Sequence, residues 1–245
     1  MNTNTLDKMN RMRLFGMHRA FKTSLETTPG AIITADEMVA MLIDSEWDDR
    51  YNRSIDRSVN NAKFRYKATL EQLDYADTRG LDKNHIHRLA DGDFVRKKTD
   101  LLITGSTGTG KSFLASAIGH QCCQLGFKVL YANATKLFAQ LKMAKADGSV
   151  IKELMKIEKQ DLLILDDFGL QTLDAGSRSS LMDIIEDRHG KHSTIITSQL
   201  PVKQWYDIIG EKTVADAILD RIVHNADRIE LKGESLRRKV KNNEE

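Results

Sequence analysis

One eight-residue run combines the residue types that bind the phosphates of a nucleotide. It reads Gly105-Ser106-Thr107-Gly108-Thr109-Gly110-Lys111-Ser112. Glycines let the backbone curl so that its amides point at phosphate oxygens, assisted by the dipole of the helix that we expect to follow. The amino group of Lys111 would reach the β- and γ-phosphates, and the Ser112 hydroxyl would coordinate Mg²⁺. The run therefore predicts a site for ATP and Mg²⁺, to which we also assign Phe113.

Two adjacent carboxylates, about 55 residues further on, suit metal binding and base catalysis. They end the apolar run Asp161-Leu162-Leu163-Ile164-Leu165-Asp166-Asp167-Phe168-Gly169. A strand buried on both faces exposes charge only at its end, which is where ligands bind in a doubly wound sheet. We expect Asp166 to hold Mg²⁺ opposite Ser112, and Asp167 to orient and deprotonate the attacking water. An acidic turn without a catalytic role is the alternative.

A third set of polar residues ends another apolar run. This run is Thr194-Ile195-Ile196-Thr197-Ser198-Gln199-Leu200. It should end at the same edge of the sheet as the acidic pair, so Ser198 or Gln199 could touch the γ-phosphate or the attacking water. The pattern does not decide between these two residues.

Two arginines near the C-terminus are further candidates. Arg221 stands in an otherwise apolar helical stretch, where it could form a surface ion pair with Asp216 or Asp220. It could instead reach the ATP of a neighbouring subunit and neutralise charge in the transition state. Arg237 follows the last predicted strand, and it could contact the γ-phosphate from its own subunit.

Five short apolar runs must position these residues. They cover residues 100–104, 127–131, 161–166, 193–198 and 227–231. Because strands that alternate with helices form βαβ units, the pattern predicts a mostly parallel five-stranded sheet with helices on both faces. Residues 68–99 should open this α/β domain, which we place at residues 68–245.

Residues 1–67 contain only helical patterns and predict a small all-helical N-terminal domain. Thr34 and Glu37 form a capping box, and apolar residues at steps of three to five predict one long helix from there to Val59. An earlier, shorter helix should end near Pro29 and Gly30. Its apolar positions are Met9, Met17, Phe21 and Leu25.

Composition limits the classes of protein that are compatible with the chain. Its 245 residues are 40% hydrophobic and carry a net charge of +2, which excludes a disordered chain and a uniformly basic, histone-like one. The apolar runs are too short to span a bilayer, and the N-terminus lacks the apolar core of a signal peptide. Cys122 and Cys123 are adjacent, which suits buried thiols better than a disulfide. We therefore expect a cytoplasmic protein without a membrane partner.

The order of these motifs resembles that of the AAA+ ATPases. More closely, it is similar to the branch that holds bacterial helicase loaders and the IstB-type helper ATPases of insertion-sequence transposition. The stretch DSEWDDRYNRSIDRSVNNAKFRYKATLEQLDY resembles a helix and a junction that are typical of IstB proteins. The resemblance covers the chain from about residue 6 to about residue 240.

The resemblance implies an ATPase that assembles as a ring or helical filament on double-stranded DNA and recruits or activates a transposase. It also implies one role for each candidate: Lys111 and Ser112 in Walker A, Asp166 and Asp167 in Walker B, Gln199 as sensor 1, Arg221 as the trans-acting arginine finger and Arg237 as sensor 2. The chain departs from the pattern at Gln199, where asparagine is commoner, and at Asp167, where a glutamate would be the commoner base. Asp167 thus leaves room for slow or partner-dependent hydrolysis. Only about 14 residues follow the last predicted strand, so the C-terminal lid should be minimal or absent, as in the IstB group.

Two basic clusters could contact DNA. The first contains Arg50, Arg53, Arg57 and Lys63, and the second contains Lys136, Lys142 and Lys145. On a helix the three arginines share a stripe on the side away from Tyr51, Ile55 and Val59, so we expect them to face outward and follow phosphates. Either cluster alone could also be a solvated helix face. Without a helix-turn-helix pattern, recognition of the DNA backbone and shape is expected.

Three other functions remain open from the sequence. A helicase loader would use the same ATP site and a different partner, which a neighbouring transposase gene would argue against. A small-molecule kinase would be a monomer with an acceptor pocket and no need for Arg221 in trans. A nucleotide-gated DNA scaffold would bind ATP with negligible turnover.

Overall fold

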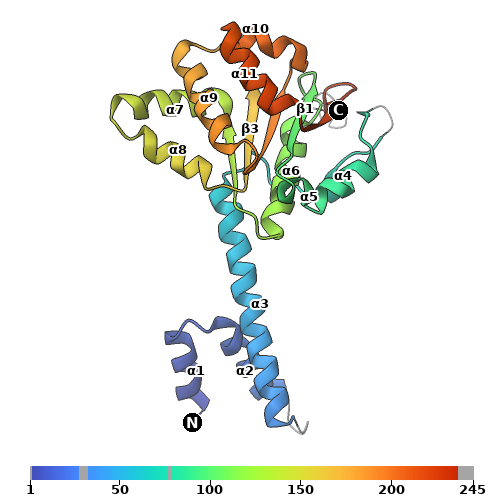
Figure 1. The fold of residues 1–245 in the computed structure, drawn as a ribbon. Coiled ribbons are helices and arrows are strands. Elements are labelled where there is room, and N and C mark those ends of the chain that lie inside the picture. Colours follow the sequence, from blue (N-terminus) through green and yellow to red (C-terminus); the bar gives the residue numbers. More distant parts are fainter. Residues whose placement is uncertain (1, 28–32, 77–78, 237–245) are drawn as a thin grey trace, which may run out of the picture. The chain divides into compact units, whose positions relative to one another are not determined.

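The computed structural model of the chain describes residues 2–27, 33–76 and 79–236. It divides into two compact units, Met1–Arg57 and Ser58–Glu245. The division falls ten residues before the expected boundary at residue 67, because Val59, Ala62 and Phe64 pack into the core of the second unit. Figure 1 shows the helices and strands of both units in chain order.

The first unit is helical, as predicted. It contains α1 (Asn2–Arg11), α2 (Phe15–Thr27) and the greater part of α3 (Ala35–Ala62), a single helix of 28 residues. The capping box is confirmed: the Thr34 amide donates to Oε2 of Glu37 at 2.9 Å, and the Glu37 amide donates to Oγ1 of Thr34 at 3.3 Å. The long helix therefore begins where its sequence signal predicts.

The single short helix predicted before α3 is instead two helices. Arg13 adopts a left-handed conformation with φ of 59°, and the Leu14 amide donates to the Met9 carbonyl at 2.9 Å. This hydrogen bond closes α1 in the manner of a Schellman motif, which normally uses glycine at the left-handed position. An arginine there carries no sequence signal for a break, so the prediction was wrong. The expected end near Pro29 and Gly30 lies outside the described residues.

The start of α2 packs closely on α3. The amides of Gly16 and Met17 donate to Oε2 of Glu46 at 2.9 Å and 3.3 Å, so a buried carboxylate caps α2. A Cβ atom at Gly16 would lie 2.1 Å from the carbonyl oxygen of Ser45, so only glycine allows this approach. The first unit is thus held together by a polar contact between two helices.

The second unit contains a five-stranded parallel sheet in the order β2-β3-β4-β1-β5. All five predicted strands are confirmed. Their bounds are β1 (Asp100–Gly105), β2 (Val129–Asn133), β3 (Leu162–Phe168), β4 (Ser193–Ser198) and β5 (Ala226–Leu231). Since β4 lies between β1 and β3, the residues that follow it lie between the ends of those two strands.

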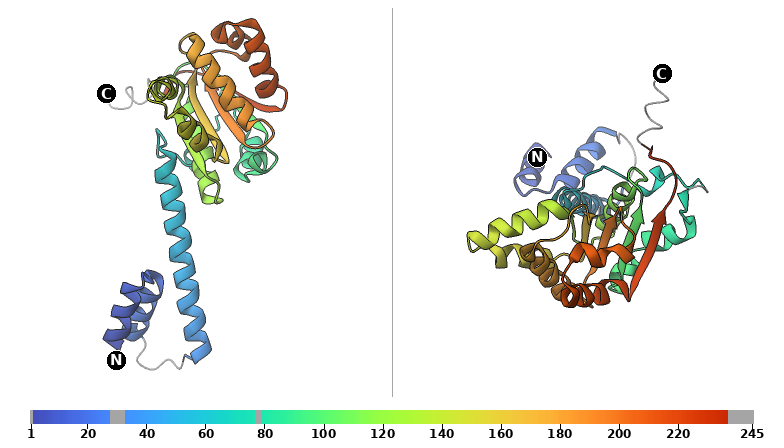
Figure 2. Two further views of the ribbon diagram at one scale, coloured as in Figure 1. Left: turned by 60° about the vertical axis from the view of Figure 1, so that its left-hand side comes forward. Right: turned by 90° about the horizontal axis from the view of Figure 1, so that it is seen from above.

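Helices cover both faces of the sheet, as Figures 1 and 2 show. One core joins alternate strand residues such as Leu101 and Ile164 to α3, α4, α5 and α6, and the other joins Leu102 and Leu163 to α7 through α11. This alternation is the period-two pattern of strands buried on both faces. The helices are η1 (Leu70–Gln72), α4 (Lys83–Ala90), α5 (Asp93–Arg96), α6 (Lys111–Gln124), α7 (Ala134–Ala146), α8 (Val150–Glu158), α9 (Ala175–Arg188), η3 (Val202–Gln204), α10 (Trp205–Ile209) and α11 (Lys212–Val223).

Two further expectations concern the cysteines and the membrane. Cys122 and Cys123 are buried in α6 and unlinked, and burial raises the pKa of both thiols to about 12. The prediction of buried thiols is therefore confirmed. None of the helices in the described ranges combines the length and the hydropathy that a bilayer span requires.

Candidate functional site

The predicted phosphate loop joins β1 to α6. Its strand ends at Gly105 and its helix begins at Lys111, which is the strand–loop–helix arrangement that the motif requires. Gly108 has φ of 83°, and a Cβ atom there would lie 2.1 Å from the Ser235 hydroxyl oxygen, so another residue would not fit. The Leu236 amide donates to the Gly108 carbonyl at 3.0 Å. The segment after β5 therefore packs against this loop.

The beginning of α6 is open toward an anion. Gly110 caps the helix in a left-handed conformation and supplies no side-chain cap. The first-turn amides, which include those of Ser112 and Phe113, have no helical acceptor. The Lys111 amino group donates to the carbonyls of Gly105 and Ser106 at 2.7 Å and 2.8 Å. An ammonium group held at the loop beside open amides fits the phosphates of ATP.

Arg79, which belongs to none of the sequence motifs, supports the same loop. Its guanidinium group donates through Nη2 to the Thr109 carbonyl, and Nη1 lies 3.5 Å from Oδ2 of Asp74. Arg79 is 7% exposed, and within the described residues its Nε has no hydrogen-bond partner. Arg79 was not predicted, because it lies 30 residues before its acceptor, Thr109, and no local sequence pattern links the two.

The acidic pair lies in a β-bulge of β3. Leu165 pairs with Ile196 and Phe168 pairs with Ser198, so two residues of β3 oppose Thr197 alone. Asp167 has φ of 58° within this bulge. As a result the Asp166 side chain is fully buried, whereas that of Asp167 remains 18% exposed. The two carboxylates thus face different surroundings.

Two hydroxyl groups fix the Asp166 carboxylate. Thr197 donates to its Oδ1 at 2.5 Å, and the Tyr131 hydroxyl donates to its Oδ2. Burial, together with the contact to Asp166, raises the pKa of Tyr131. Thr197 also accepts a hydrogen bond from the Asp167 amide at 3.0 Å. Neither residue was predicted, because polar side chains inside strands carry no signal of their own.

Ser112 and Asp166 also fit Mg²⁺. The Ser112 hydroxyl and the Asp166 carboxylate, which accepts hydrogen bonds from two neutral hydroxyl groups, are hard oxygen ligands of the kind that the ion prefers. The described residues hold no cluster of three or more acidic, histidine or cysteine side chains that could bind a metal alone. Ser112 and Asp166 would therefore hold the ion together with the phosphates of a nucleotide, as is usual for Mg²⁺.

Arg65 and Asn133 also contact the acidic pair. Nη1 of Arg65 lies 3.0 Å from Oδ2 of Asp167 and 3.6 Å from Oδ2 of Asp166. The Asn133 amide group donates to Oδ2 of Asp167 at 3.4 Å. Arg65 is 102 residues from Asp167, in the segment that follows α3, and it was not predicted because no motif links the two positions.

Of the two residues proposed at the end of β4, Gln199 reaches the phosphate loop. Its Oε1 accepts a hydrogen bond from the Thr107 hydroxyl at 2.6 Å. The Ser198 hydroxyl instead donates to the Phe168 carbonyl at 2.8 Å and is fully buried. Gln199 therefore contacts the phosphate loop, whereas Ser198 makes a contact between strands.

The two C-terminal arginines differ in what the structure describes. Arg221 lies on α11, where Nη1 donates to the Ala217 carbonyl at 2.9 Å and Nη2 lies 4.0 Å from a carboxylate oxygen of Glu186. Its ion-pair partner among the described residues is thus Glu186, and Asp220 lies instead 3.5 Å from His224. Arg237 lies outside the described residues.

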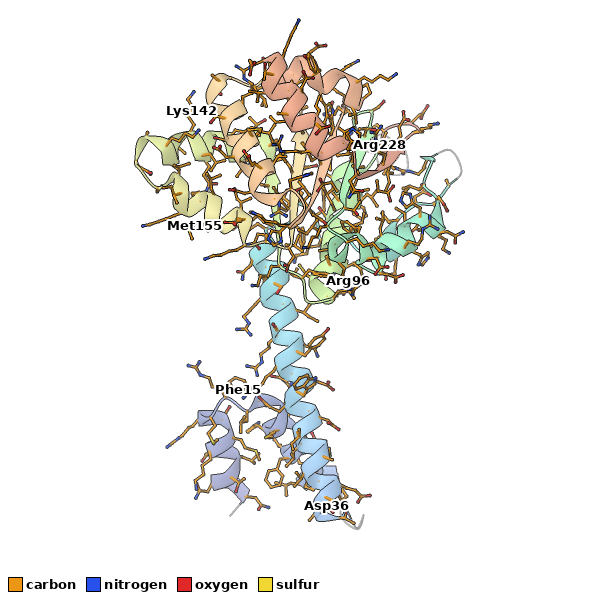
Figure 3. The ribbon with its side chains drawn as sticks, in the orientation of Figure 1. Phe15, Asp36, Arg96, Lys142, Met155 and Arg228 are labelled. Atoms are coloured by element: carbon orange, nitrogen blue, oxygen red, sulfur yellow. The ribbon has the colours of Figure 1, made fainter. Side chains whose placement is uncertain are left out.

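The arginines of α3 are largely exposed, but two of them pair with carboxylates of the same helix. Arg50 pairs with Glu46 at 2.7 Å, and Arg53 pairs with Asp49 at 2.6 Å. The Arg53 guanidinium also stacks over the ring of Phe15, which is labelled in Figure 3, at 5.0 Å. The packed face of α3 differs from the expected one, because α2 packs on its polar face, at Ser45, Glu46 and Asp49.

The consequence for α3 is an apolar face that α2 leaves uncovered. Trp47 is 72% exposed and Tyr51 is 50% exposed, and Val39 and Ile43 are exposed as well. Arg57 is exposed, as Arg50 is, but its guanidinium donates to a backbone carbonyl, that of Arg53, at 3.2 Å, whereas Arg50 and Arg53 pair with carboxylates. Of the three, Arg57 is therefore the best placed for a phosphate.

The lysines of the second predicted cluster all lie on α7 but point to different neighbours. Lys142, labelled in Figure 3, pairs with Asp174 at 3.1 Å, and Lys145 lies 3.5 Å from the Ser179 hydroxyl. Lys136 instead lines a cavity of about 1190 Å³ along the edge strand β2, together with Lys63 and Arg65. The three lysines therefore do not form one surface.

Comparisons with known proteins agree with this site. A family model described as IstB-like ATP binding protein matches residues 7–244. The insertion sequence ATP-binding protein y4pL of Sinorhizobium fredii is 45% identical over 234 residues, which are 96% of each chain. The solved structure of DnaI has a TM-score of 0.58 and 28% identity, covering 68% of this chain and 92% of that chain. A replication initiator DnaA bound to AMPPCP and single-stranded DNA shares the fold, with a TM-score of 0.56 and 19% identity, over 74% of this chain and 55% of that chain.

The family match spans both units, and the relative aligns over nearly its full length. The phosphate loop, the acidic pair and the five strands of the sheet all lie within the matched residues. The second unit has the AAA+ fold, and the chain belongs to the IstB-like ATP-binding protein family.

Proposed function

We propose that this protein is a Mg²⁺-dependent ATPase that assembles on double-stranded DNA and recruits or activates the transposase of an insertion sequence. The ATPase part of the proposal rests on contacts made by Thr197, near the end of β4, and by Gln199, which follows that strand. Gln199 contacts the phosphate loop through Thr107, and Thr197 contacts both acidic residues. The insertion-sequence relative supports the role in transposition.

Nucleotide binding would rest on the loop and on the start of α6. The first-turn amides and the Lys111 ammonium would neutralise charge on the phosphate oxygens. Ser112 and Asp166 would hold Mg²⁺, which when bound supplies neutralisation of the charge on the transferred phosphoryl group. Tyr131 and Thr197 would keep Asp166 in one orientation.

Asp167 would act on the attacking water. Its backbone is fixed by Thr197, and its carboxylate lies in the exposed part of the bulge. An oxygen of this carboxylate would orient a water molecule and accept its proton. Gln199, at the loop, would lie on the side of the γ-phosphate and detect its loss.

Assembly would supply the remaining positive charge. Arg221 would reach the ATP of a neighbouring subunit in the homo-oligomer, and Arg237 would contact the γ-phosphate of its own. Arg57, Lys63 and Lys136 would bind DNA phosphates without reading sequence, while Arg50, Arg53, Lys142 and Lys145 already have partners in the structure. The complex would act in the cytoplasm, on the cell's DNA.

The Lys111→Ala variant tests the nucleotide site. It should lose ATP binding by about 100-fold, because the backbone amides alone do not offset the phosphate charge. Calorimetry with ATP measures this, with the exposed Lys191→Ala as a control for the loss of one charge. Wild-type affinity in Lys111→Ala would refute the phosphate-loop assignment.

Mixed assemblies test the role of Arg221 in trans. Arg221→Ala should bind ATP normally and hydrolyse it about 10³–10⁵ times more slowly, which is the usual effect of an arginine finger. Mixing Arg221→Ala with Lys111→Ala subunits should restore part of the activity, since an intact Lys111 can then face an intact Arg221. Lys212→Ala, on the same helix, is the matched control. If mixed oligomers form and none regains activity, Arg221 has no role in trans.

One observation favours a second candidate, a nucleotide-gated DNA scaffold with negligible turnover. Oδ2 of the proposed base, Asp167, is already in contact with Arg65 at 3.0 Å and with the Asn133 amide group at 3.4 Å, so both groups compete with a water molecule for it. Electron microscopy with duplex DNA, with and without a non-hydrolysable ATP analogue, would show assembly under either candidate. Only the ATPase would release DNA faster with ATP than with the analogue.

A further inference from the structure

Three consecutive residues that follow α3 contact three parts of the ATP site. The Phe64 ring lies 6.4 Å from that of Tyr131, whose hydroxyl holds Asp166. The Tyr66 ring lies 6.1 Å from that of Phe113, in the first turn of α6. Arg65, between them, pairs with the acidic residues. Residues 64–66, which follow α3, therefore contact the acidic pair, the Tyr131 ring and the first turn of α6.

Arg65 is the one member of this triplet that carries charge. Its Nη1 lies 3.0 Å from Asp167 and 3.6 Å from Asp166, in each case from Oδ2. Its side chain remains 42% exposed, and it stacks on the adjacent Tyr66 at 5.5 Å. An exposed arginine that is held by two carboxylates, the Tyr131 hydroxyl group and one ring can leave them without opening the core.

The acidic residues do not depend on Arg65 for their orientation. Asp166 accepts hydrogen bonds from Thr197 and Tyr131, one on each oxygen. Asp167 is held through its amide by Thr197 and through its carboxylate by Asn133. Because neutral groups already fix both residues, the guanidinium mainly contributes positive charge. That charge opposes a divalent cation at the same carboxylates.

We propose that Arg65 and Mg²⁺-bound nucleotide compete for the acidic pair, so that binding of the nucleotide with its metal displaces Arg65 and loosens residues 63–67 from the site. The proposal rests on the Mg²⁺–ATP site of the proposed function and adds its regulation. The displaced segment directly follows Ala62, the last residue of α3. Exchange of Arg65 for Mg²⁺ at the acidic pair would in this way alter the contacts of the segment that follows α3.

Competition predicts a specific change in metal dependence. The ratio of ATP affinity with Mg²⁺ to ATP affinity in EDTA, measured by calorimetry, should rise about tenfold in Arg65→Gln, since loss of one ionic competitor is of this size. Arg65→Lys should lie between Arg65→Gln and wild type. Lys67→Gln removes the same charge from an exposed residue two positions away and should change the ratio less than about twofold.

Hydrogen exchange gives a second readout that does not depend on turnover. In the wild type, ATP with Mg²⁺ should speed the exchange of amides in residues 63–67 by about threefold or more, and ATP in EDTA should not. In Arg65→Gln these amides should exchange fast under all conditions. The first-turn amides of α6 should be protected by ATP in every variant, which reports nucleotide binding separately.

The outcomes separate this inference from the proposed function. If ATP protects α6 while the Mg²⁺ ratio of Arg65→Gln stays at the wild-type value or falls, Arg65 supports the metal site and the competition is wrong. If ATP with Mg²⁺ slows exchange in residues 63–67, the displacement is wrong. If the wild type binds no ATP at all, the proposed function fails, and this inference fails with it.

Discussion

Both units of the molecule bury carboxylates beside arginines, but they hold them differently. In the helical unit, Glu46 and Asp49 pair with Arg50 and Arg53 one turn away on the same helix, and Glu46 also caps α2. In the sheet unit, Asp166 is held by neutral hydroxyls, and its arginine comes from a distant segment. The ion pairs of the helical unit are a fixed part of its packing, because removal of one partner leaves a buried charge without compensation.

The second arrangement leaves its arginine free to be exchanged for another cation. Asp166 and Asp167 keep their neutral partners without Arg65, so the cost of losing the guanidinium is small. In this molecule, the comparison assigns the arginine-paired acids of α3 to the stability of the helical unit. Under the proposed function, the hydroxyl-bound Asp166 would be available for a metal ion.

Among the substitutions that compare the buried acids of the two units, the largest expected effect is on turnover in the sheet unit. Asp167→Asn should lower ATP hydrolysis by about 10²–10⁴, the usual contribution of a general base, because an amide does not accept the proton of the attacking water. ATP affinity and thermal stability should stay near wild type. Steady-state turnover, calorimetry and thermal unfolding measure these quantities, with the exposed Asp207→Asn as control. Unchanged turnover would mean that the base lies elsewhere.

In the helical unit the corresponding substitution should affect stability and leave the chemistry unchanged. Glu46→Gln should destabilise the packing of α2 on α3 by about 1–3 kcal/mol, since it removes a charged acceptor of two amides and of Arg50. Hydrogen exchange of α2 measures this, and Asp44→Asn, an exposed residue of the same helix, is the control. An equal loss in both variants would contradict the special role of Glu46.

The same carboxylate predicts how the helical unit responds to acid. Partial burial acts to raise the pKa of Glu46, but Arg50 and the amides of Met17 and Gly16 outweigh it, so the pKa is lowered from 4.5. Its stabilising effect is therefore complete above about pH 4.5 and is lost as the pH falls through the lowered value. Exchange of α2 should accelerate over that range in the wild type. In Glu46→Gln this pH dependence should be absent.

The smallest expected effect concerns DNA. Arg57 is exposed, whereas Arg50 is neutralised by Glu46, so Arg57→Gln should weaken duplex binding several-fold and Arg50→Gln should weaken it less. The slope of the salt dependence should flatten by about 0.9 for each DNA phosphate that is no longer neutralised, equally for unrelated sequences. Fluorescence anisotropy over a salt series measures both the affinity and this slope. Weaker binding to one sequence alone would indicate base recognition instead.

The features that the sequence predicts are those with local causes. The five strands and the loop that ends at Lys111 follow from hydrophobic runs and glycine spacing. The capping box of Thr34 and Glu37 fixes the start of α3 within four residues. Each of these signals is complete within a short window, so no tertiary contact is needed to interpret it.

The features that the sequence does not predict depend on contacts between distant segments. In the bulge at Asp167, Thr197 of the neighbouring strand accepts a hydrogen bond from the Asp167 amide, and Arg65 contacts Asp167 from 102 residues away in the sequence. The buried face of α3 depends on where α2 packs, which periodicity alone does not reveal. The left-handed Arg13 breaks a helix without glycine or proline. The bulge, the Arg65 contact and the packed face of α3 depend on residues far away in the sequence. At Arg13 the residue type itself gives no signal.

The central claim is that the phosphate loop and the acidic pair form one site for a metal-bound nucleotide. Electron paramagnetic resonance of Mn²⁺, in place of Mg²⁺, tests this with wild type and Asp166→Asn. Mn²⁺ should bind tightly only when ATP is present, and Asp166→Asn should weaken that binding about tenfold while ATP affinity in EDTA stays unchanged. Mn²⁺ binding that needs no nucleotide, or that is unaffected by Asp166→Asn, would contradict the claim.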